Sequence, residues 1–359
     1  MGFRNANHAI YGAEHLRCAV TASRLQLAML ADMHAPDGFL NTGTAIVTAG
    51  ISAGTLGVAL RQLKHTVTEK VIPLAGIVAA FVFAAQMFNF PVAAGTTGHL
   101  MGGALAAILL GPHLGVIVVA VVIIVQAVFF ADGGLTALGY NILNMAIVPA
   151  YGGWAAYTIF RTWLPKTSGG VIGATALAAW LSVVLSAAAF SLQWLFGATA
   201  EIPFTTVFGA MVGVHALIGI GEALISAFAV GAVLVSRPDL VYGARDLDRS
   251  QLDRESKVPM RTFLIGGLLA ALVFAAIVSQ FAVDNPDGLE WVAGEQGFID
   301  SGRDHRLDNW IFADYATRGI ENETLSLAIA GIVGTVITLL VAWGLLSAVR
   351  DKPPSAART

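Results

Sequence analysis

Residues 114–131 read LGVIVVAVVIIVQAVFFA and contain one polar side chain, Gln126. A membrane-spanning helix needs about 20 consecutive apolar residues. In lipid the backbone must satisfy its own hydrogen bonds, so such a run is typical of an α-helix that crosses a bilayer.

The composition of the whole chain extends this interpretation. Of 359 residues, 56% are hydrophobic and only 12% are charged, whereas soluble domains average about 25% charged residues. The 39 glycines suit close helix packing in membranes. We therefore predict an all-α, polytopic helix bundle in a lipid bilayer, and the net charge of -3 gives no reason to expect a nucleic-acid partner.

Apolar runs divide the chain into two groups of spans. The third run is short, and we expect it to be tilted or to continue into the fourth through Gly111 and Pro112. We predict a seven-span domain over 33–236, a cytoplasmic linker over 237–261, and a two-span domain over 262–359 with an outer loop at 284–323. The predicted spans are 41–60, 71–89, 99–111, 114–131, 138–160, 170–193, 205–236, 262–283 and 324–348.

Basic residues predict the orientation. Fourteen Lys and Arg residues follow the first, fifth, seventh and ninth spans, whereas the connections on the opposite side hold three, Arg303, Arg306 and Arg318. Because basic connections stay in the cytoplasm, we expect a multi-pass protein of the cell membrane with its C-terminus in the cytoplasm.

Two polar islands, Met33–Leu40 and Asn89–His99, flank the first two spans on the expected outer side. We predict that they meet there and hold a divalent metal ion. Cys18 is the only cysteine, so the ligands are nitrogen, oxygen or methionine sulfur.

A chain that starts at Met33 offers a chelate by covalent geometry. Its α-amine has a pKa of about 7.7–8.0 and can lose its proton to a metal. The amide nitrogen and the imidazole of His34 close two successive rings with that amine, and His99 can complete a square. Square nitrogen coordination suits Ni(II) and Cu(II), and can also hold Co(II).

The 32 residues before Met33 conflict with this chelate, because an attached residue turns the amine into an amide. We expect much of segment 1–32 to be absent from the working protein. A disordered or amphipathic tail remains the alternative.

Polar residues within or at the ends of spans are costly in lipid and mark pathways or polar packing. Those that we expect to form a network around the metal or within the bundle are Gln86, Asn89, Asn141, Asn144, His215 and Glu222. His215 and Glu222 lie two helical turns apart on one face. We expect them to pair and brace the bundle, with a network below the metal as the alternative.

The loop 284–323 carries ten carboxylates against three arginines. We interpret most of these carboxylates as part of a solvated linker. The alternative is that an acidic outer loop attracts cations toward a site beneath it.

Several motifs resemble one family. The stretches 33–40, 79–92, 98–112, 132–139 and 214–223 are similar to the CbiM/NikM substrate-binding components of energy-coupling factor transporters, which import cobalt or nickel. Pro286–Trp291 resembles the signature of the companion component, CbiN/NikN, fused here to the same chain.

The resemblance implies a specific role and specific partners. It implies that Met33, His34 and His99 hold Co²⁺ or Ni²⁺ as transported substrate at the outer face, with no cofactor belonging to the chain itself. It also implies a transmembrane coupling protein and two cytoplasmic ATPase subunits as partners, and imported cobalt would supply cobalamin biosynthesis.

Two other classes of protein fit the sequence less well. A zinc protease needs a motif such as H-E-x-x-H, which the sequence lacks, and the G-x-x-x-x-G-K-[ST] nucleotide loop is also missing. We therefore predict a transport component rather than an enzyme. A self-contained secondary transporter for divalent metals is the alternative, and dependence on ATPase subunits would discriminate the two. The sequence does not distinguish cobalt from nickel as the transported metal.

Overall fold

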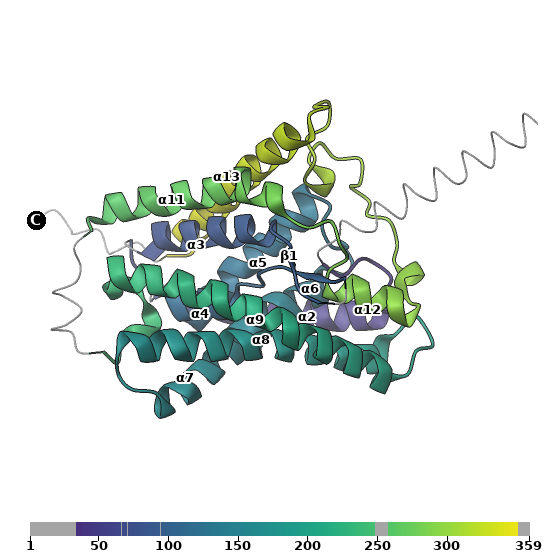
Figure 1. The fold of residues 1–359 in the computed structure, drawn as a ribbon, viewed down its shortest axis with the longest axis horizontal. Helices are drawn as coiled ribbons and strands as arrows, with labels where there is room; N and C mark the ends of the chain where they lie inside the picture. The colour runs from purple at the N-terminus through teal and green to yellow at the C-terminus, as the bar shows by residue number, and fades with distance from the viewer. Residues whose placement is uncertain (1–33, 66, 70, 94, 248–257, 351–359) are drawn as a thin grey trace, which may run out of the picture.

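The computed structural model describes residues 34–65, 67–69, 71–93, 95–247 and 258–350. Predictions for segment 1–32, for Met33 and for 351–359 lie outside these residues. The described chain is mostly helical, and the long helices run along the long axis of the molecule (Figure 1). The helices are α2 (Thr42–Lys64), α3 (Val71–Gln86), α4 (Gly103–Leu110), α5 (Pro112–Phe129), α6 (Leu138–Ile142), the π-helix η1 (Leu143–Gly152), α7 (Gly153–Trp163), α8 (Ser168–Gly197), α9 (Phe204–Ser236), α11 (Met260–Ala276), α12 (Gly288–Gln296) and α13 (Glu323–Val349).

Short elements connect these helices. Strands β1 (Phe90–Pro91) and β2 (Thr97–Gly98) form an antiparallel pair in which Phe90 lies opposite Gly98. The short 3₁₀ helices are η2 (Pro238–Leu240), η3 (Tyr242–Ala244), η4 (Val278–Phe281), η5 (Ile299–Ser301) and η6 (Ala313–Tyr315).

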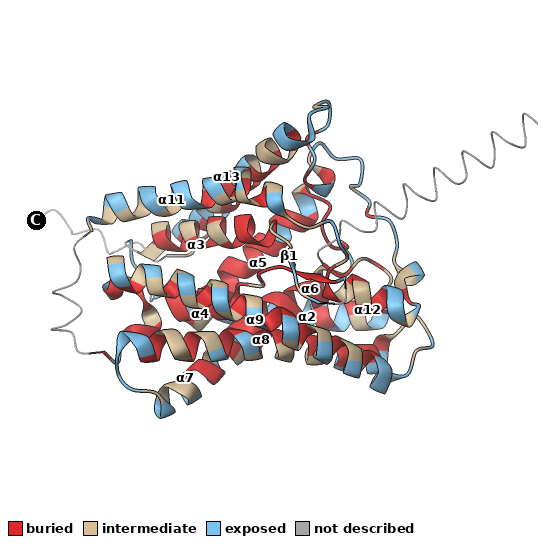
Figure 2. Ribbon diagram, viewed as in Figure 1, coloured by how far each residue is buried: buried red, intermediate tan, exposed pale blue. Residues whose placement is uncertain are grey.

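Helices occupy all nine predicted ranges, and the predicted class of polytopic helical membrane protein is confirmed. Within the described residues, six helices are long and apolar enough to cross a membrane, namely α2, α5, α8, α9, α11 with η4, and α13. Large apolar side chains such as Phe196, Phe228 and Val235 are about four-fifths exposed, at 79%, 80% and 80%. Figure 2 shows buried residues gathered on α4 and α5 and exposed faces on α11 and α9, an arrangement suited to a lipid surround.

The third predicted span begins later than expected and does not continue into the fourth as one unbroken helix. Residues 99–102 are not helical, α4 contains only eight residues, and all eight are buried. Gly111 has a φ of +92° and reverses the chain, so that Gly115 of α5 packs against the backbone of Ala107. The segment therefore enters the bundle as irregular backbone and returns as a tight helical hairpin, which a membrane protein tolerates where protein surrounds the backbone.

The carboxylate of Glu222, on α9, stabilises this irregular backbone. It accepts hydrogen bonds from the amides of Met101, at 2.6 Å, and of Gly102, at 2.9 Å. These amides lie at the start of α4, where helix geometry leaves donors without partners and a negative charge is favourable.

The C-terminal helices belong to the same bundle. Both α11 and α13 pack against α3, and Gly334 of α13 allows close approach to Phe83. Between these helices the chain leaves the bundle, and α12 packs against α9 (Figure 1). Asp287 caps α12 by accepting hydrogen bonds from the amides of Leu289 and Glu290, both at 2.8 Å.

Replacing Gly115 by Ala should destabilise the hairpin. A Cβ at Gly115 would lie 2.6 Å from the backbone nitrogen of Ala107, and overpacking of this kind costs about 1–3 kcal/mol. The matched control is Gly54→Ala on α2, where a Cβ meets no atom of the described residues within 4 Å. Thermal unfolding in detergent should show a lower midpoint for Gly115→Ala alone, and equal midpoints would contradict this packing.

Candidate metal site

The first polar island is fixed by a buried carboxylate. The Oδ1 atom of Asp37 accepts hydrogen bonds from the amide of Thr136, at 2.8 Å, its hydroxyl, at 2.7 Å, and the amide of Ala137, at 2.8 Å. These donors lie at the start of α6, so Asp37 acts as a helix cap supplied from a distant part of the chain. The aspartate of the first motif is therefore structural.

The carbonyl groups that follow His34 are also held. Asn141 donates to the carbonyl of Ala35 at 2.9 Å, and the hydroxyl of Tyr140 donates to the carbonyl of Pro36 at 2.8 Å. The backbone next to His34 is thus attached to α6 at two consecutive residues.

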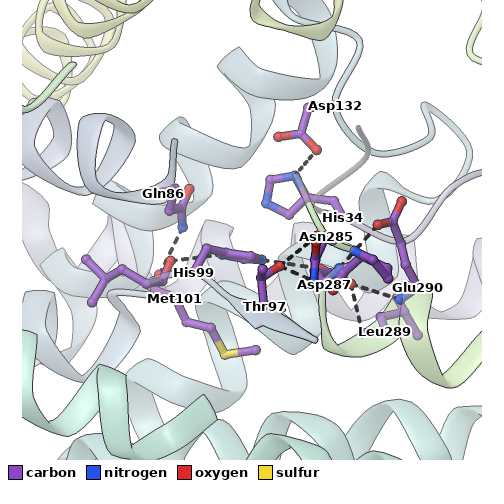
Figure 3. A network of polar contacts seen from close by, with 12 residues as sticks. His34, Gln86, Thr97, His99, Met101, Asp132, Asn285, Asp287, Leu289 and Glu290 are labelled. Atoms are coloured by element: carbon purple, nitrogen blue, oxygen red, sulfur yellow. Dashed lines mark hydrogen bonds and ion pairs between the residues drawn. The ribbon is translucent and has the colours of Figure 1, made fainter. Parts of the chain in front are cut away.

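The second island is held by the C-terminal part of the chain. Thr97 donates through its amide to the carbonyl of Pro286, at 2.9 Å, and through its hydroxyl to that of Asn285, at 2.9 Å. His99 follows β2 by one residue and lies beside this contact (Figure 3).

The structure brings His34 and His99 together. Their ring centroids lie 6.0 Å apart, with an interplanar angle of 74°. Their exposed fractions are only 2% and 8%. Two neutral imidazoles are good ligands for Ni²⁺ and Co²⁺, and burial excludes competing water from the pair.

Each histidine faces a carboxylate (Figure 3). The Nδ1 atom of His34 lies 2.8 Å from Oδ1 of Asp132, and Nε2 of His99 lies 3.6 Å from Oδ2 of Asp287. Burial would raise the pKa of Asp132, but the contact with His34 outweighs it and the pKa lies below its ordinary value. Asp132 therefore stays negatively charged beside the imidazole.

Neither carboxylate was among the predicted site residues. Asp132 lies at the end of a span, within a stretch that resembles the family, and Asp287 was assigned with the loop 284–323 to a solvated linker. The linker interpretation is wrong for Asp287 and Glu290, which are both buried.

A small cavity lies between the two histidines. Its volume is about 60 Å³, which suits an ion or a few waters, and α12 contributes to its wall. The side chains that line it include those of His34, His99, Asn141, Asn144, His215 and Asp287.

The other members of the predicted network support the backbone after His99. Gln86 donates to the carbonyl of Met101 at 3.1 Å, while Glu222 accepts from its amide. Asn144 exchanges hydrogen bonds with Gln193, at 3.1 and 2.6 Å.

His215 and Glu222 have different partners, so the expected pairing between them is wrong. The Nδ1 atom of His215 contacts the carbonyl of Met211 at 2.8 Å, whereas Glu222 binds the main chain at Met101. Asn89 does not line the cavity. Its main-chain carbonyl accepts a hydrogen bond from the main-chain amide of Val283 at 3.0 Å.

Among the described residues, no three His, Cys, Asp or Glu side chains converge as ligands of one metal ion. The predicted ligand set does not require three, because it combines two imidazoles with two main-chain nitrogens. One of those nitrogens belongs to Met33, outside the described residues, so the chelate stays a prediction.

Residues 34–240 match the family described as the cobalt uptake substrate-specific transmembrane region. The chain belongs to this family. Residues 261–351 match the PDGLE domain, and we call this part the PDGLE unit.

Similar proteins include some named as fused nickel transport proteins and one named as a cobalt transport protein. A protein of Archaeoglobus fulgidus whose name includes NikMN is 33% identical over 87% of this chain and 98% of its own length. The fused nickel transport protein NikMN of Rhodobacter capsulatus is 36% identical over 59% of this chain and 65% of its own length. The cobalt transport protein CbiM of Sorangium cellulosum is 31% identical over 62% of this chain and 97% of its own length.

A solved structure shares the fold. A truncated transition metal transporter superposes with a TM-score of 0.50 and 29% identity, covering 56% of this chain and 98% of that chain. The protein is thus a multi-pass membrane component of cobalt or nickel transport.

Asp287→Asn should weaken metal binding without loosening α12. Asparagine caps helices about as well as aspartate, but the substitution removes a negative charge 3.6 Å from Nε2 of His99. We expect a several-fold loss of Ni²⁺ affinity by calorimetry and an unchanged unfolding midpoint. Asp284→Asn, in the same loop but exposed, is the control, and equal affinities for both variants would refute a role for Asp287.

Proposed function

We propose that this chain is the metal-capture subunit of an energy-coupling factor importer for Co²⁺ or Ni²⁺. One observation carries the proposal: two buried imidazoles lie 6.0 Å apart beside an ion-sized cavity of about 60 Å³, inside the domain that matches the cobalt uptake family.

The ligands are four nitrogens. The amine of Met33, the amide and imidazole of His34, and the imidazole of His99 surround the ion in one plane. Asp37, Asn141 and Tyr140 fix the backbone after His34. The backbone therefore loses little further conformational freedom when the ion binds.

The site faces outward and the C-terminus faces the cytoplasm, in agreement with the basic residues after the first, fifth, seventh and ninth spans. PDGLE residues 285–290 cover the site from this outer side. An ion thus enters past Asp287, whose charge attracts it.

Energy comes from other subunits. The sequence contains no phosphate-binding loop of the G-x-x-x-x-G-K-[ST] type, so a coupling protein and two cytoplasmic ATPases drive release of the ion. When cobalt is the substrate, the imported ion supplies cobalamin biosynthesis.

His99→Ala should abolish tight Ni²⁺ and Co²⁺ binding, since it removes one of two imidazoles. The fold should survive, because the contact of His99 with the carbonyl of Leu100 is local, at 3.2 Å, and its contact with Asp287, at 3.6 Å, is longer than a hydrogen bond. The control is His113→Ala, whose ring contacts Tyr151 at 2.8 Å and does not line the cavity. Unchanged binding in His99→Ala would remove His99 from the site.

Uptake of radioactive nickel or cobalt into cells should require the coupling and ATPase subunits. Cells that express this chain alone should accumulate no more metal than cells with an empty vector. An ATPase subunit with its catalytic glutamate replaced is the control for subunit assembly. Full uptake by the chain alone would instead identify a secondary transporter.

A further inference from the structure

The PDGLE unit reaches the metal site at a second point, on the side of His34. The hydroxyl of Tyr315 donates a hydrogen bond of 2.6 Å to Oδ2 of Asp132. Both residues are buried, at 7% and 2% exposed. The other oxygen of the same carboxylate, Oδ1, contacts His34, so Asp132 links the PDGLE unit to the predicted ligand.

Several contacts hold Tyr315 in this position. Its ring stacks on Phe130 at 5.0 Å and 20°, and the amide of Asp314 donates to the carbonyl of Phe130 at 2.9 Å. Asp314 and Tyr315 have φ values of +55° and +54°, in the left-handed region that non-glycine residues rarely adopt. Two consecutive residues in this conformation persist only where the surroundings require it, and such residues gather at functional sites.

The nitrogen of His34 that faces Asp132 is the one that a chelate requires. Nδ1 closes a six-membered ring with the His34 amide nitrogen through the metal, whereas Nε2 points away from the backbone. Two ligand atoms bound at a right angle to one metal, each at about 2.0–2.1 Å, lie about 2.9 Å apart. Nδ1 and Oδ1 are 2.8 Å apart, so an ion on Nδ1 stays within reach of the carboxylate.

The charge of Asp132 is opposite to the net charge expected for the metal with its four nitrogen ligands. A divalent ion bound to one deprotonated amide and three neutral nitrogens leaves a net charge of about +1. A buried net charge is costly unless an opposite charge accompanies it. The negative carboxylate of Asp132 supplies that charge.

We propose that Tyr315 of the PDGLE unit positions Asp132 so that its carboxylate holds the His34 imidazole through Nδ1–H before the metal arrives. When the metal replaces that proton on Nδ1, the same carboxylate lies beside the metal and offsets its charge. Metal affinity in the first domain is therefore set in part by the second. This inference rests on the proposed function, because it takes His34 as a metal ligand.

The test is Tyr315→Phe in the full chain, purified from its host and titrated with NiCl₂. The substitution keeps the ring on Phe130 and removes only the hydroxyl. Loss of a hydrogen-bond partner that supports a metal site from outside the ligand set weakens binding by about 10–100-fold. We expect about 10-fold here, with a shifted absorption band of the bound Ni²⁺. Tyr157→Phe is the matched control. The hydroxyl of Tyr157 donates to the carbonyl of Gly243 at 2.7 Å, and neither Tyr157 nor Gly243 lines the cavity.

A double-mutant cycle with Asp132→Asn separates positioning from general destabilisation. If Tyr315 acts through Asp132, the double variant binds Ni²⁺ no more weakly than Asp132→Asn alone. Additive losses, or an affinity and spectrum of Tyr315→Phe equal to those of the parent, would overturn the proposal.

The His99→Ala variant keeps the two proposals distinguishable. Loss of binding in His99→Ala with parental binding in Tyr315→Phe rejects only the role of Tyr315. If the parent chain itself binds no Ni²⁺ or Co²⁺, the proposed function fails.

Discussion

The hydrogen bonds of Glu222 to the main chain of Met101 and Gly102 are the constraint on which the site depends. Non-helical backbone inside an apolar bundle has amides that need partners, and this carboxylate provides two acceptors in one place. Gln86 of α3 donates a hydrogen bond to the carbonyl of Met101. His99 lies two residues before this anchored point, so its position in the bundle follows from a residue that does not touch the cavity.

The second organising feature is the closure of the site by two parts of the chain. The first domain supplies His34, His99 and Asp132, and the PDGLE unit supplies Asp287 and Tyr315. These contacts reach both histidines from different directions. Fusion of the two domains therefore places the supporting groups at a fixed ratio of one to one with the imidazoles.

Much of the fold follows from sequence because apolar runs are local signals. The nine ranges and the two histidines could be read directly, since helix formation in lipid leaves few alternatives. The break at residues 99–102 could not, because Leu100 and Met101 lead without interruption into the apolar run and the break is stabilised by the distant Glu222. The roles of Asp132, Asp287 and Tyr315 could not be predicted either, because they too depend on residues far away in the sequence. Tyr315, for example, lies 183 residues from its partner Asp132. A single sequence contains no sign of such pairs.

The bond between Tyr315 and Asp132 also has a consequence for biosynthesis. His34, Asp132 and His99 leave the ribosome long before the chain reaches residue 315, and α13 follows later still. Contacts of such large sequence separation form late, because loop closure must precede them. During insertion into the membrane the nascent protein thus holds an unfinished site with two imidazoles and no tyrosine hydroxyl behind Asp132. On the proposal for Tyr315, a chain that ends before residue 315 would therefore bind metal more weakly than the full chain.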